Sequence, residues 1–284
     1  MSKTDLPPFT GGGAAVITGA ASGIGLAAAR RFAAMGMPVV LADLSGEKLR
    51  AAETSIREAG GRVAAVPTDV AKASDLERLR DLTLQHFGHV GVLMNNAGVG
   101  MNPGRTWQNL DAWRSLMEVN LWGAINGVQA FLPAMVEARW PAFVINTGSK
   151  QGITTPPGNA AYNVSKAALK AYTEALQHEL RNTEGCPISA HLLIPGFTFT
   201  GITGVKQKPA AAWTADQVVD FMLESLGRGD FYILCPDNDV DRATDEKRMA
   251  WAIGDLIENR PALSRWHPDW KARFEAFMAG RPSG

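Results

Sequence analysis

The sequence contains very little cysteine. Cys186 and Cys235 are the only two among 284 residues, and neither has a cysteine or histidine partner at metal-ligand spacing. This scarcity excludes a disulfide-dense fold. None of the five histidines belongs to a pattern such as HExxH, so no bound metal is expected. Two reduced thiols are typical of a cytoplasmic protein.

The sequence also lacks an excess of charge of either sign and any long apolar run. Lys and Arg number 28, Asp and Glu number 28, and the formal net charge is zero. Nucleic-acid or membrane-surface binding needs a concentrated positive field, so neither partner is expected. No apolar run approaches the roughly 20 residues of a membrane-spanning helix. The opening residues 1–13 do not resemble a signal peptide, which again favours a soluble, cytoplasmic protein.

Short apolar segments alternate with longer helical patterns. The predicted strands are Ala14–Thr18, Val39–Asp43, Val63–Val66, Gly91–Asn95, Phe143–Thr147, Ile188–Ile194 and Phe231–Cys235. The predicted helices are Gly23–Met35, Gly46–Ala59, Ser74–Phe87, Leu110–Glu137, Ala160–Arg181 and Thr214–Leu226. Most strands are continuously apolar, as in a parallel sheet covered on both faces. The pattern predicts an α/β fold, a doubly wound, parallel, seven-stranded Rossmann-like sheet flanked by helices.

The last part of the sequence breaks this alternation. We predict one Rossmann-type domain over residues 1–236 and a helical C-terminal extension over residues 237–284, packed on it. In the extension, Met249, Ile253, Leu256 and Ile257 recur at helical spacing and predict one apolar stripe. The extension is either a packed structural tail or a cover or subunit contact near a substrate pocket.

A glycine-rich turn follows the first predicted strand. Its glycines are Gly19, Gly23 and Gly25. Glycine permits positive φ and close approach of a ligand to the backbone. The N-terminus of the helix that follows presents free N–H groups to an anion. A strand before the turn and a helix after it therefore predict a site for a dinucleotide pyrophosphate.

Asp43 ends the second predicted strand, about 20 residues beyond the glycines, where an acid can bind the adenosine ribose. Its carboxylate would repel a 2′-phosphate by roughly 1–4 kcal/mol. No Lys or Arg adjoins Asp43 and position 22 is Ser, so NAD is favoured over NADP. The alternative is that Asp43 caps a helix with Ser45.

Tyr162 and Lys166 lie four residues apart near the start of a predicted helix and therefore project from one face of it. Tyrosine has an ordinary pKa near 10. A lysine ammonium and an oxidised nicotinamide ring would both favour the phenolate and lower this pKa. The pair thus predicts a proton acceptor.

Ser149 comes just after the predicted strand Phe143–Thr147. Loops at the carboxyl ends of parallel strands line the ligand crevice. Ser149 is therefore placed to donate a hydrogen bond to a substrate oxygen. Thr147 and Lys150 are nearby alternatives, and Lys150 is expected to be solvated.

With these residues in place, the sequence resembles the short-chain dehydrogenase/reductase family over roughly residues 11–236. The motifs are each short, but their order and spacing are specific. They are Thr18-Gly19-Ala20-Ala21-Ser22-Gly23-Ile24-Gly25, Asn95-Asn96-Ala97-Gly98, Asn120 within MEVNLWG, Ser149, Tyr162-Asn163-Val164-Ser165-Lys166, and Pro195-Gly196 followed by Thr200.

The resemblance implies a role for each matching residue. Tyr162 would be the general acid/base and Ser149 would position the substrate oxygen. Lys166 would hold the nicotinamide ribose, and Asn120 would help to hold a water that relays protons. The implied cofactor-binding residues are Thr18, Gly19, Ser22, Gly23, Ile24, Gly25, Asp43, Leu44, Asp69, Val70, Asn96, Ala97, Gly98, Tyr162, Lys166, Pro195, Gly196, Thr198 and Thr200. Among these, Asp69 would contact the adenine amino group.

These parts predict an NAD-dependent enzyme that transfers a hydride between NAD and a secondary alcohol or ketone. Apolar and aromatic residues near the site favour a bulky substrate: Met101, Trp107, Ile153, Pro156, Phe197, Phe199 and Trp213. The tail segment ENRPALSRWHPDW is similar to that of family members acting on large aromatic alcohols. The family resemblance also implies a homodimer or homotetramer that acts on a small molecule.

Two other functions stay open at this point. One is an NADP-dependent 3-oxoacyl reductase of the same fold, which Asp43 and the unusual ending after Cys235 disfavour. The other is a non-catalytic dinucleotide-binding sensor, which would not need the set Asn120, Ser149, Tyr162 and Lys166.

Overall fold

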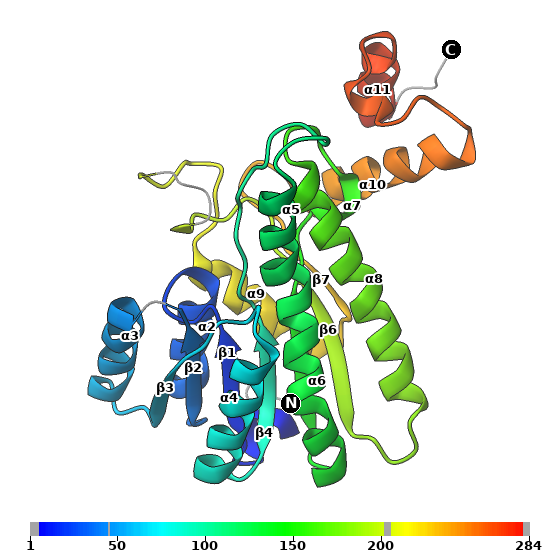
Figure 1. The fold of residues 1–284 in the computed structure, drawn as a ribbon. Coiled ribbons are helices and arrows are strands. Elements are labelled where there is room, and N and C mark those ends of the chain that lie inside the picture. Colours follow the sequence, from blue (N-terminus) through cyan, green and yellow to red (C-terminus); the bar gives the residue numbers. More distant parts are fainter. Residues whose placement is uncertain (1–5, 45, 202–205, 281–284) are drawn as a thin grey trace.

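The fold is built on a seven-stranded parallel sheet. The computed structural model describes residues 6–44, 46–201 and 206–280, so Ser45 lies outside the described residues. The strand order is β3-β2-β1-β4-β5-β6-β7, which confirms the predicted doubly wound sheet (Figure 1). The strands are β1 (Ala14–Thr18), β2 (Val39–Asp43), β3 (Val63–Pro67), β4 (Val90–Asn95), β5 (Ala142–Thr147), β6 (Ile188–Ile194) and β7 (Tyr232–Leu234).

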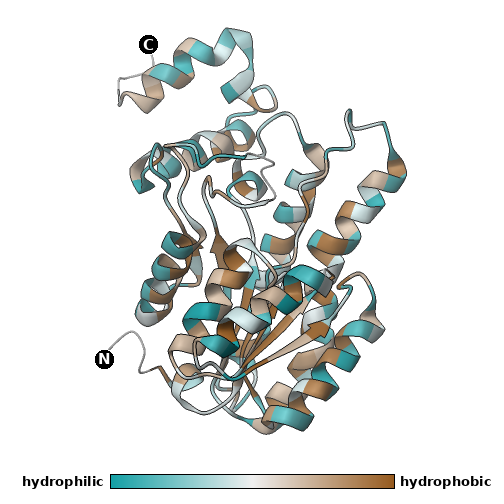
Figure 2. Ribbon diagram, turned by 90° about the vertical axis from the view of Figure 1, so that its left-hand side faces the viewer, coloured by the Kyte–Doolittle hydropathy of each residue, from teal (hydrophilic) through white to brown (hydrophobic). Residues whose placement is uncertain are grey.

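A layer of helices covers each face of the sheet. The helices on one face are α2 (Gly23–Ala34), α3 (Gly46–Glu58) and α9 (Ala215–Arg228). Those on the other are α4 (Ala73–Phe87), α6 (Gly123–Ala138) and α8 (Ala160–Asn182). The strands are apolar between helices whose outer surfaces are hydrophilic (Figure 2). In the described part of the chain, no helix is long and apolar enough to cross a bilayer.

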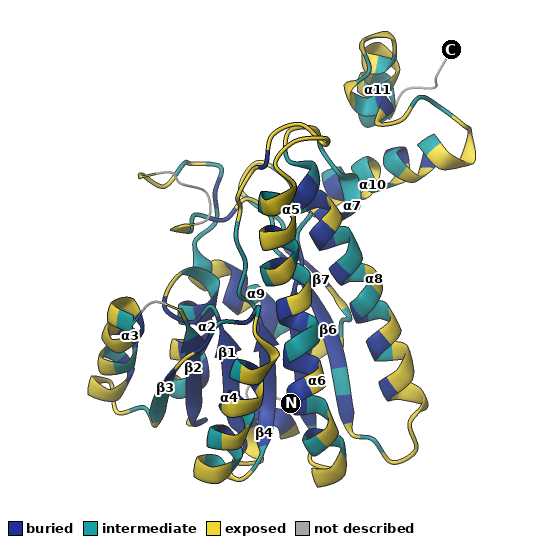
Figure 3. Ribbon diagram, in the orientation of Figure 1, coloured by how far each residue is buried: buried dark blue, intermediate teal, exposed yellow. Residues whose placement is uncertain are grey.

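Strand β1 shows why the strands are continuously apolar. All five of its residues are buried (Figure 3). Ala15 and Ile17 pack into the core beneath α2, whereas Ala14 and Val16 pack into the core on the opposite face. Because successive side chains of a strand point to opposite faces, a strand covered on both sides is apolar along most of its length, and in β1 the one polar residue is Thr18 at its end.

The predicted helix Leu110–Glu137 is interrupted. It consists of α5 (Leu110–Met117), a π-helical segment η1 (Glu118–Trp122) and α6. Such π-bulges occur frequently at functional sites, and this one contains the buried Asn120. The sequence pattern did not reveal it, because apolar spacing over two turns hardly distinguishes a π from an α turn.

Two short helices were also not predicted. In α1 (Pro7–Thr10), Phe9 is buried against Phe32 and Phe143, with ring centroids 5.8 and 5.5 Å away. The other, α7 (Gln151–Thr154), directly follows the loop that carries Ser149. Four residues are too few to show a helical periodicity.

The C-terminal extension has its own small core. It comprises α10 (Arg242–Ile257), η3 (Ser264–Trp266), η4 (Pro268–Trp270) and α11 (Lys271–Met278). The ring of Trp251 lies 5.4 Å from Phe274 and 5.2 Å from Phe277, and the Arg260 guanidinium stacks 4.2 Å from it. Trp251 Nε1 also donates to Ser264 Oγ (2.8 Å). Helix α11 thus packs on α10, on the side away from the sheet.

The apolar stripe predicted for α10 is only partly correct. Met249 packs beside Ile153 in a small cluster at the base of the extension. Ile253, Leu256 and Ile257 are instead exposed, by 56%, 80% and 76%. The buried aromatic residue of α10 is Trp251, which the stripe did not include.

Candidate active site

A cavity of about 910 Å³ opens at the carboxyl ends of the strands. It lies where the strand order reverses between β1 and β4, which is the place where ligands bind in doubly wound sheets. The predicted site residues that line it are Gly19, Ser22, Gly23, Ile24, Asp43, Leu44, Asp69, Val70, Asn96, Ala97, Gly98, Ser149, Tyr162, Lys166, Pro195, Gly196, Thr198 and Thr200.

Three predicted site residues lie behind the cavity wall. Thr18 Oγ1 accepts hydrogen bonds from the backbone N–H groups of Asn96 (3.0 Å) and Ala97 (3.1 Å). Gly25 packs on the phosphate-binding turn, where a Cβ would overlap the Gly19 carbonyl oxygen. Asn120 is buried behind Val99. These residues shape the wall without facing the cavity.

The glycine turn is built to receive an anion. Gly19 and Gly23 have φ of +66° and +54°, which L side chains rarely adopt. Ser22 is the N-cap of α2, but its side chain makes no capping hydrogen bond. The first N–H groups of α2 therefore have no side-chain acceptor from the cap, and the helix dipole favours a phosphate there. The turn fits the pyrophosphate of a dinucleotide.

The loop after β6 covers this turn. Thr200 lies against Gly23, where a Cβ would come within 3.2 Å of Thr200 Cγ2. Thr198 is buried, and its hydroxyl donates to the Gly196 carbonyl (3.1 Å). The two threonines thus face the glycine turn and the loop residues Pro195 and Gly196 in the cavity wall.

At the far end of the cavity, Asp43 joins β2 to the glycine turn. Its Oδ2 accepts a hydrogen bond from the backbone N–H of Ala21 (3.0 Å). Lys48, on the first turn of α3, also lines the cavity beside Asp43 and Leu44. The prediction of NAD considered only the residues that adjoin Asp43 in the sequence and did not include Lys48.

Asp69 and Val70 line the same end of the cavity. Asp69 Oδ1 accepts from the backbone N–H of Ala71 (3.1 Å), which orients the carboxylate at the end of β3. The Val70 carbonyl accepts from Asn126 Nδ2 (3.0 Å). These bonds hold the segment after β3 in a defined position at the cavity wall.

Asn96 joins the strand ends at the middle of the cavity. Its Nδ2 donates to the Thr18 carbonyl (3.1 Å), and its Oδ1 accepts from Thr147 Oγ1 (3.3 Å). Thr147, one of the two alternatives to Ser149, is thus occupied in linking β5 to β4. The side chain of Asn96 braces the pocket wall across three strands.

Tyr162 lies near the N-terminus of α8 and faces Ser149. The N-cap of this helix is Asn159, whose Oδ1 accepts from the Tyr162 N–H (3.2 Å). Burial raises the pKa of Tyr162 above 10.0, and a hydrogen bond with Ser149 lowers it by a smaller amount. The phenol and the serine hydroxyl therefore share one hydrogen bond at the cavity wall.

Lys166 is buried one turn beyond Tyr162. Its Nζ donates to the Thr147 carbonyl (2.7 Å) and lies 5.8 Å from the centroid of the Tyr162 ring. Burial lowers the pKa of Lys166 from 10.5 to about 8. The lowering of the Tyr162 pKa by Lys166 together with an oxidised nicotinamide ring stays a prediction. Burial dominates that pKa, and the opposing effect comes from Ser149.

Asn120 has a bracing role that the sequence did not suggest. Its Oδ1 accepts from the Val99 N–H (2.8 Å), and its Nδ2 donates to the Val99 carbonyl (3.0 Å) and to Ser165 Oγ (3.3 Å). The side chain thereby ties η1 to the loop after β4 and to α8. In this arrangement its polar side-chain atoms are engaged with the protein itself, and the expected part of Asn120 in holding a water stays a prediction.

The residues expected around the substrate divide into two groups. Met101 and Phe197 line the cavity and are 44% and 39% exposed. Trp213 instead packs on Phe221, with ring centroids 5.9 Å apart, and Ile153 packs toward the extension. Trp107, Pro156 and Phe199 are likewise not among the lining residues.

Sequence reasoning missed two polar residues of the substrate side, Gln151 and Asn159, which also line the cavity. Asn159 Nδ2 donates to the Met101 carbonyl (3.1 Å), so it links the loop after β4 to the helix that carries Tyr162. Its position as a helix cap three residues before Tyr162 was the available signal. Gln151 carries no such signal.

Lys150 is not solvated, contrary to expectation. Its Nζ lies 2.6 Å from Asp245 Oδ2 and 3.4 Å from Asp237 Oδ2, and its side chain is only 18% exposed. Both carboxylates come from the segment after β7, more than eighty residues along the chain.

No group of His, Cys, Asp and Glu side chains in the described residues could hold a metal ion.

Comparison with known proteins places these features in context. The family model described as short chain dehydrogenase matches residues 13–211. A 1-deoxy-11-beta-hydroxypentalenate dehydrogenase of Streptomyces exfoliatus is 36% identical over 262 residues, which cover 89% of this chain and 94% of that protein. The 3beta-hydroxysteroid dehydrogenase 2 of Eggerthella lenta is 33% identical over 210 residues, which cover 73% of this chain and 79% of that protein.

Solved structures show the same similarity. A short chain dehydrogenase/reductase from Burkholderia phymatum in complex with NAD has a TM-score of 0.80 and 32% identity, covering 88% of this chain and 95% of that chain. Similar solved structures include complexes with NAD and complexes with NADP.

Proposed function

Because the chain belongs to the short-chain dehydrogenase family of oxidoreductases, we propose that it transfers a hydride between NAD and a bulky, apolar or aromatic secondary alcohol or its ketone. The observation that carries this proposal is the placement of Ser149, Tyr162 and Lys166 on one wall of a cavity whose opposite end is a phosphate-binding turn. A purely dinucleotide-binding protein has no physical need for this acid–base group.

The side chains supply the proton transfer. In oxidation, Tyr162 in its phenolate form would take the proton of the substrate hydroxyl. NAD, when bound, would supply the acceptor for the hydride from the carbon that bears this hydroxyl. Ser149, whose hydroxyl already bonds with Tyr162, donates to the substrate oxygen. In reduction, Tyr162 returns the proton. Lys166, with a pKa near 8, can take up or release a proton close to neutral pH and so supports the exchange at Tyr162.

The residues that would hold NAD extend along the cavity. The N-terminus of α2 would take the pyrophosphate, and Asp43 would accept hydrogen bonds from the adenosine ribose hydroxyls. The charge of Asp43 favours NAD over NADP, because a 2′-phosphate beside it would be repelled. The positive charge of Lys48, which also lines the cavity, would attract a 2′-phosphate and so favours NADP. Asp43 is fixed at the glycine turn by the hydrogen bond from the Ala21 N–H.

An apolar or aromatic substrate is supported by Met101, Val99 and Phe197 on the cavity wall. The related dehydrogenases named for a hydroxypentalenate and a hydroxysteroid also favour a large alcohol. We further propose a homodimer or homotetramer located in the cytoplasm. The two unpaired cysteines, Cys186 and Cys235, agree with a reducing compartment.

The proposal is tested by a screen of secondary alcohols graded by size, in which reduction of NAD is followed by absorbance. We expect turnover to rise from small to large apolar or aromatic alcohols. Tyr162→Phe should reduce turnover at least a hundredfold, because it removes the proton acceptor, while NADH binding, followed by fluorescence, stays nearly unchanged. Turnover by Tyr162→Phe close to that of the wild type would refute the assignment.

Cofactor choice is tested separately. Asp43→Ala should lower the ratio of kcat/KM for NAD over NADP by about tenfold or more, since one charge repulsion of roughly 1–4 kcal/mol is removed. Lys48→Ala is the matched variant and should raise this ratio slightly. A ratio unchanged in Asp43→Ala, or a wild-type enzyme that prefers NADP, would contradict the role of Asp43.

A further inference from the structure

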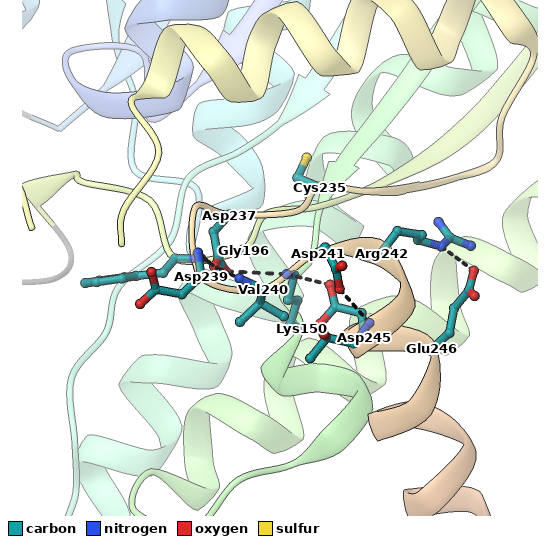
Figure 4. A network of polar contacts seen from close by, with 12 residues as sticks. Lys150, Gly196, Cys235, Asp237, Asp239, Val240, Asp241, Arg242, Asp245 and Glu246 are labelled. Atoms are coloured by element: carbon teal, nitrogen blue, oxygen red, sulfur yellow. Dashed lines mark hydrogen bonds and ion pairs between the residues drawn. The ribbon is translucent and has the colours of Figure 1, made fainter. Parts of the chain in front are cut away.

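A cluster of charges joins the C-terminal extension to the loop that carries Ser149. Lys150, the residue after Ser149, lines the cavity, and its ammonium group lies among carboxylates of the segment that follows β7 (Figure 4). Its Nζ lies 2.6 Å from Asp245 Oδ2 and 3.4 Å from Asp237 Oδ2. Neither carboxylate belongs to the part of the chain that the family model matches, residues 13–211.

Asp237 also holds a second loop of the site. Its Oδ2 accepts a hydrogen bond from the backbone N–H of Phe197 (3.1 Å), and its Oδ1 accepts from the N–H of Val240 (2.9 Å). One carboxylate therefore joins Lys150 to the loop after β6. That loop includes Gly196, and Phe197 lines the substrate side of the cavity.

The backbone at Gly196 lies close to the side chains of this cluster. A Cβ at Gly196 would lie 2.8 Å from Asp237 Oδ2 and 3.0 Å from Lys150 Nζ. Both atoms are at the ends of side chains of the cluster, so these side chains would have to shift to admit a Cβ at this position. The glycine at position 196 thus serves the ion cluster as well as any bound cofactor.

Lys150 also sets the backbone next to Ser149. It is the N-cap residue of α7, and its carbonyl accepts from the N–H groups of Ile153 (3.0 Å) and Thr154 (3.1 Å). On its other side, α7 packs tightly on α8, where a Cβ at Gly152 would lie 2.5 Å from the Lys166 carbonyl carbon. Helix α7 is therefore held between the helix that carries Tyr162 and the extension.

The charged side chains of the cluster are largely shielded from water, which favours a fixed position for the two loops that they join. The side chains of Asp237 and Asp245 are 6% and 8% exposed, and that of Lys150 is 18% exposed. Charges that are withdrawn from water in this way attract one another more strongly than surface pairs and are less screened by salt. Losing one partner leaves the others buried without compensation.

We propose that Lys150, Asp237 and Asp245 form a clamp through which the C-terminal extension positions Ser149 and the loop Pro195–Phe197 on either side of the reacting atoms. The three are positioning residues that act through Ser149 and Phe197. The inference rests on the proposed function and deepens it, because it makes the extension part of the catalytic architecture.

The test compares Lys150→Met, Asp245→Asn and the conservative Lys150→Arg with the wild-type enzyme. The matched control is Arg242→Met, which breaks the exposed pair Arg242–Glu246 (2.7 Å) on the same helix α10. Activity on the best alcohol of the graded screen is expressed per NADH-binding site, so that unfolded protein does not count. Hydrogen exchange is measured in parallel on the full-length protein without ligand.

The clamp predicts a loss in kcat of about tenfold to a hundredfold for Lys150→Met and Asp245→Asn, the effect of displacing a reacting group by a fraction of an ångström to an ångström. KM should change less, and Lys150→Arg should stay within about threefold of the wild type. The amides of Gln151, which donates to Ser149 Oγ, and Phe197, which donates to Asp237, should exchange faster. Arg242→Met should change none of these quantities.

Wild-type kcat per site in Lys150→Met and Asp245→Asn would overturn the proposal, even if both variants melted at a lower temperature. Faster exchange without a loss of kcat would overturn it as well. The proposed function fails separately, when the wild-type enzyme turns over no alcohol in the screen. In that case the exchange rates of residues 149–154 and 196–200 still decide whether the clamp holds the two loops.

Discussion

Replacement of Lys166 by methionine should change how stability depends on pH. Burial lowers the pKa of Lys166 from 10.5 to about 8. A tenfold change in an equilibrium corresponds to about 1.4 kcal/mol, so a pKa moved this far corresponds to roughly 3 kcal/mol. Because Lys166 is buried, water hardly screens its charge. The pKa shift can therefore be converted into a contribution to the free energy of unfolding.

The sign follows from proton binding. Between pH 8 and 10.5 the unfolded chain keeps the proton on this lysine, while the folded protein has released it. Stability from Lys166 therefore rises with pH through this window. The favourable contribution of the neutral Lys166 to stability is present in full above pH 10.5 and is lost as the pH falls through 8. Relative to Lys166→Met, the wild type should gain about 2 kcal/mol between pH 7.5 and 9.5.

The assay is urea unfolding at half-unit steps from pH 7.5 to 10, with the free energies of unfolding of wild type and variant subtracted at each pH. Subtraction removes the contribution of other groups that titrate in this range, such as Tyr172 and Tyr232. Lys170→Met is the control, since Lys170 lies one turn along α8 in a partly exposed pair with Glu174. A difference between wild type and Lys166→Met that stays constant with pH would refute the reasoning.

Three further outcomes are expected. Gly127→Ala should lower the free energy of unfolding by about 1–3 kcal/mol in urea denaturation, because its Cβ would overlap the buried side chain of Asn95; an unchanged midpoint would contradict the packing. Burial raises the pKa of Cys235 to about 12. An aromatic disulfide reagent should therefore label Cys186 first and react with Cys235 only after unfolding. Equal labelling rates of the two thiols would contradict this expectation. Ser264→Ala removes two side-chain hydrogen bonds within the extension and should make it more sensitive to limited proteolysis; wild-type cleavage rates would show that these bonds are dispensable.

Local patterns predicted the frame of this protein well. Continuous apolar runs such as Ala14–Thr18 predicted strands covered on both sides, and the glycines at 19, 23 and 25 predicted the turn before α2. Tyr162 and Lys166 share a helix face because four residues make about one turn. In each case the relation lies within one element or one connection, where backbone geometry alone sets it.

Features that depend on contacts between distant segments could not be predicted in this way. Lys150 looked like a surface residue until the fold placed it between two carboxylates of the extension. Ile253 looked like a core position on α10, yet the core of the extension formed around Trp251.

The sequence by itself therefore determined the sheet, the glycine turn before α2 and the placement of Tyr162 and Lys166 on one helix face, because short-range spacing and polarity are sufficient for them. The tertiary structure alone decided which side chains close the site. It placed Lys48 in the wall of the cavity that Asp43 also lines, packed Trp213 on Phe221 and joined Lys150, the residue after Ser149, to the extension. Such pairs form across tens of residues, and their energies depend on burial that exists only after the chain has folded.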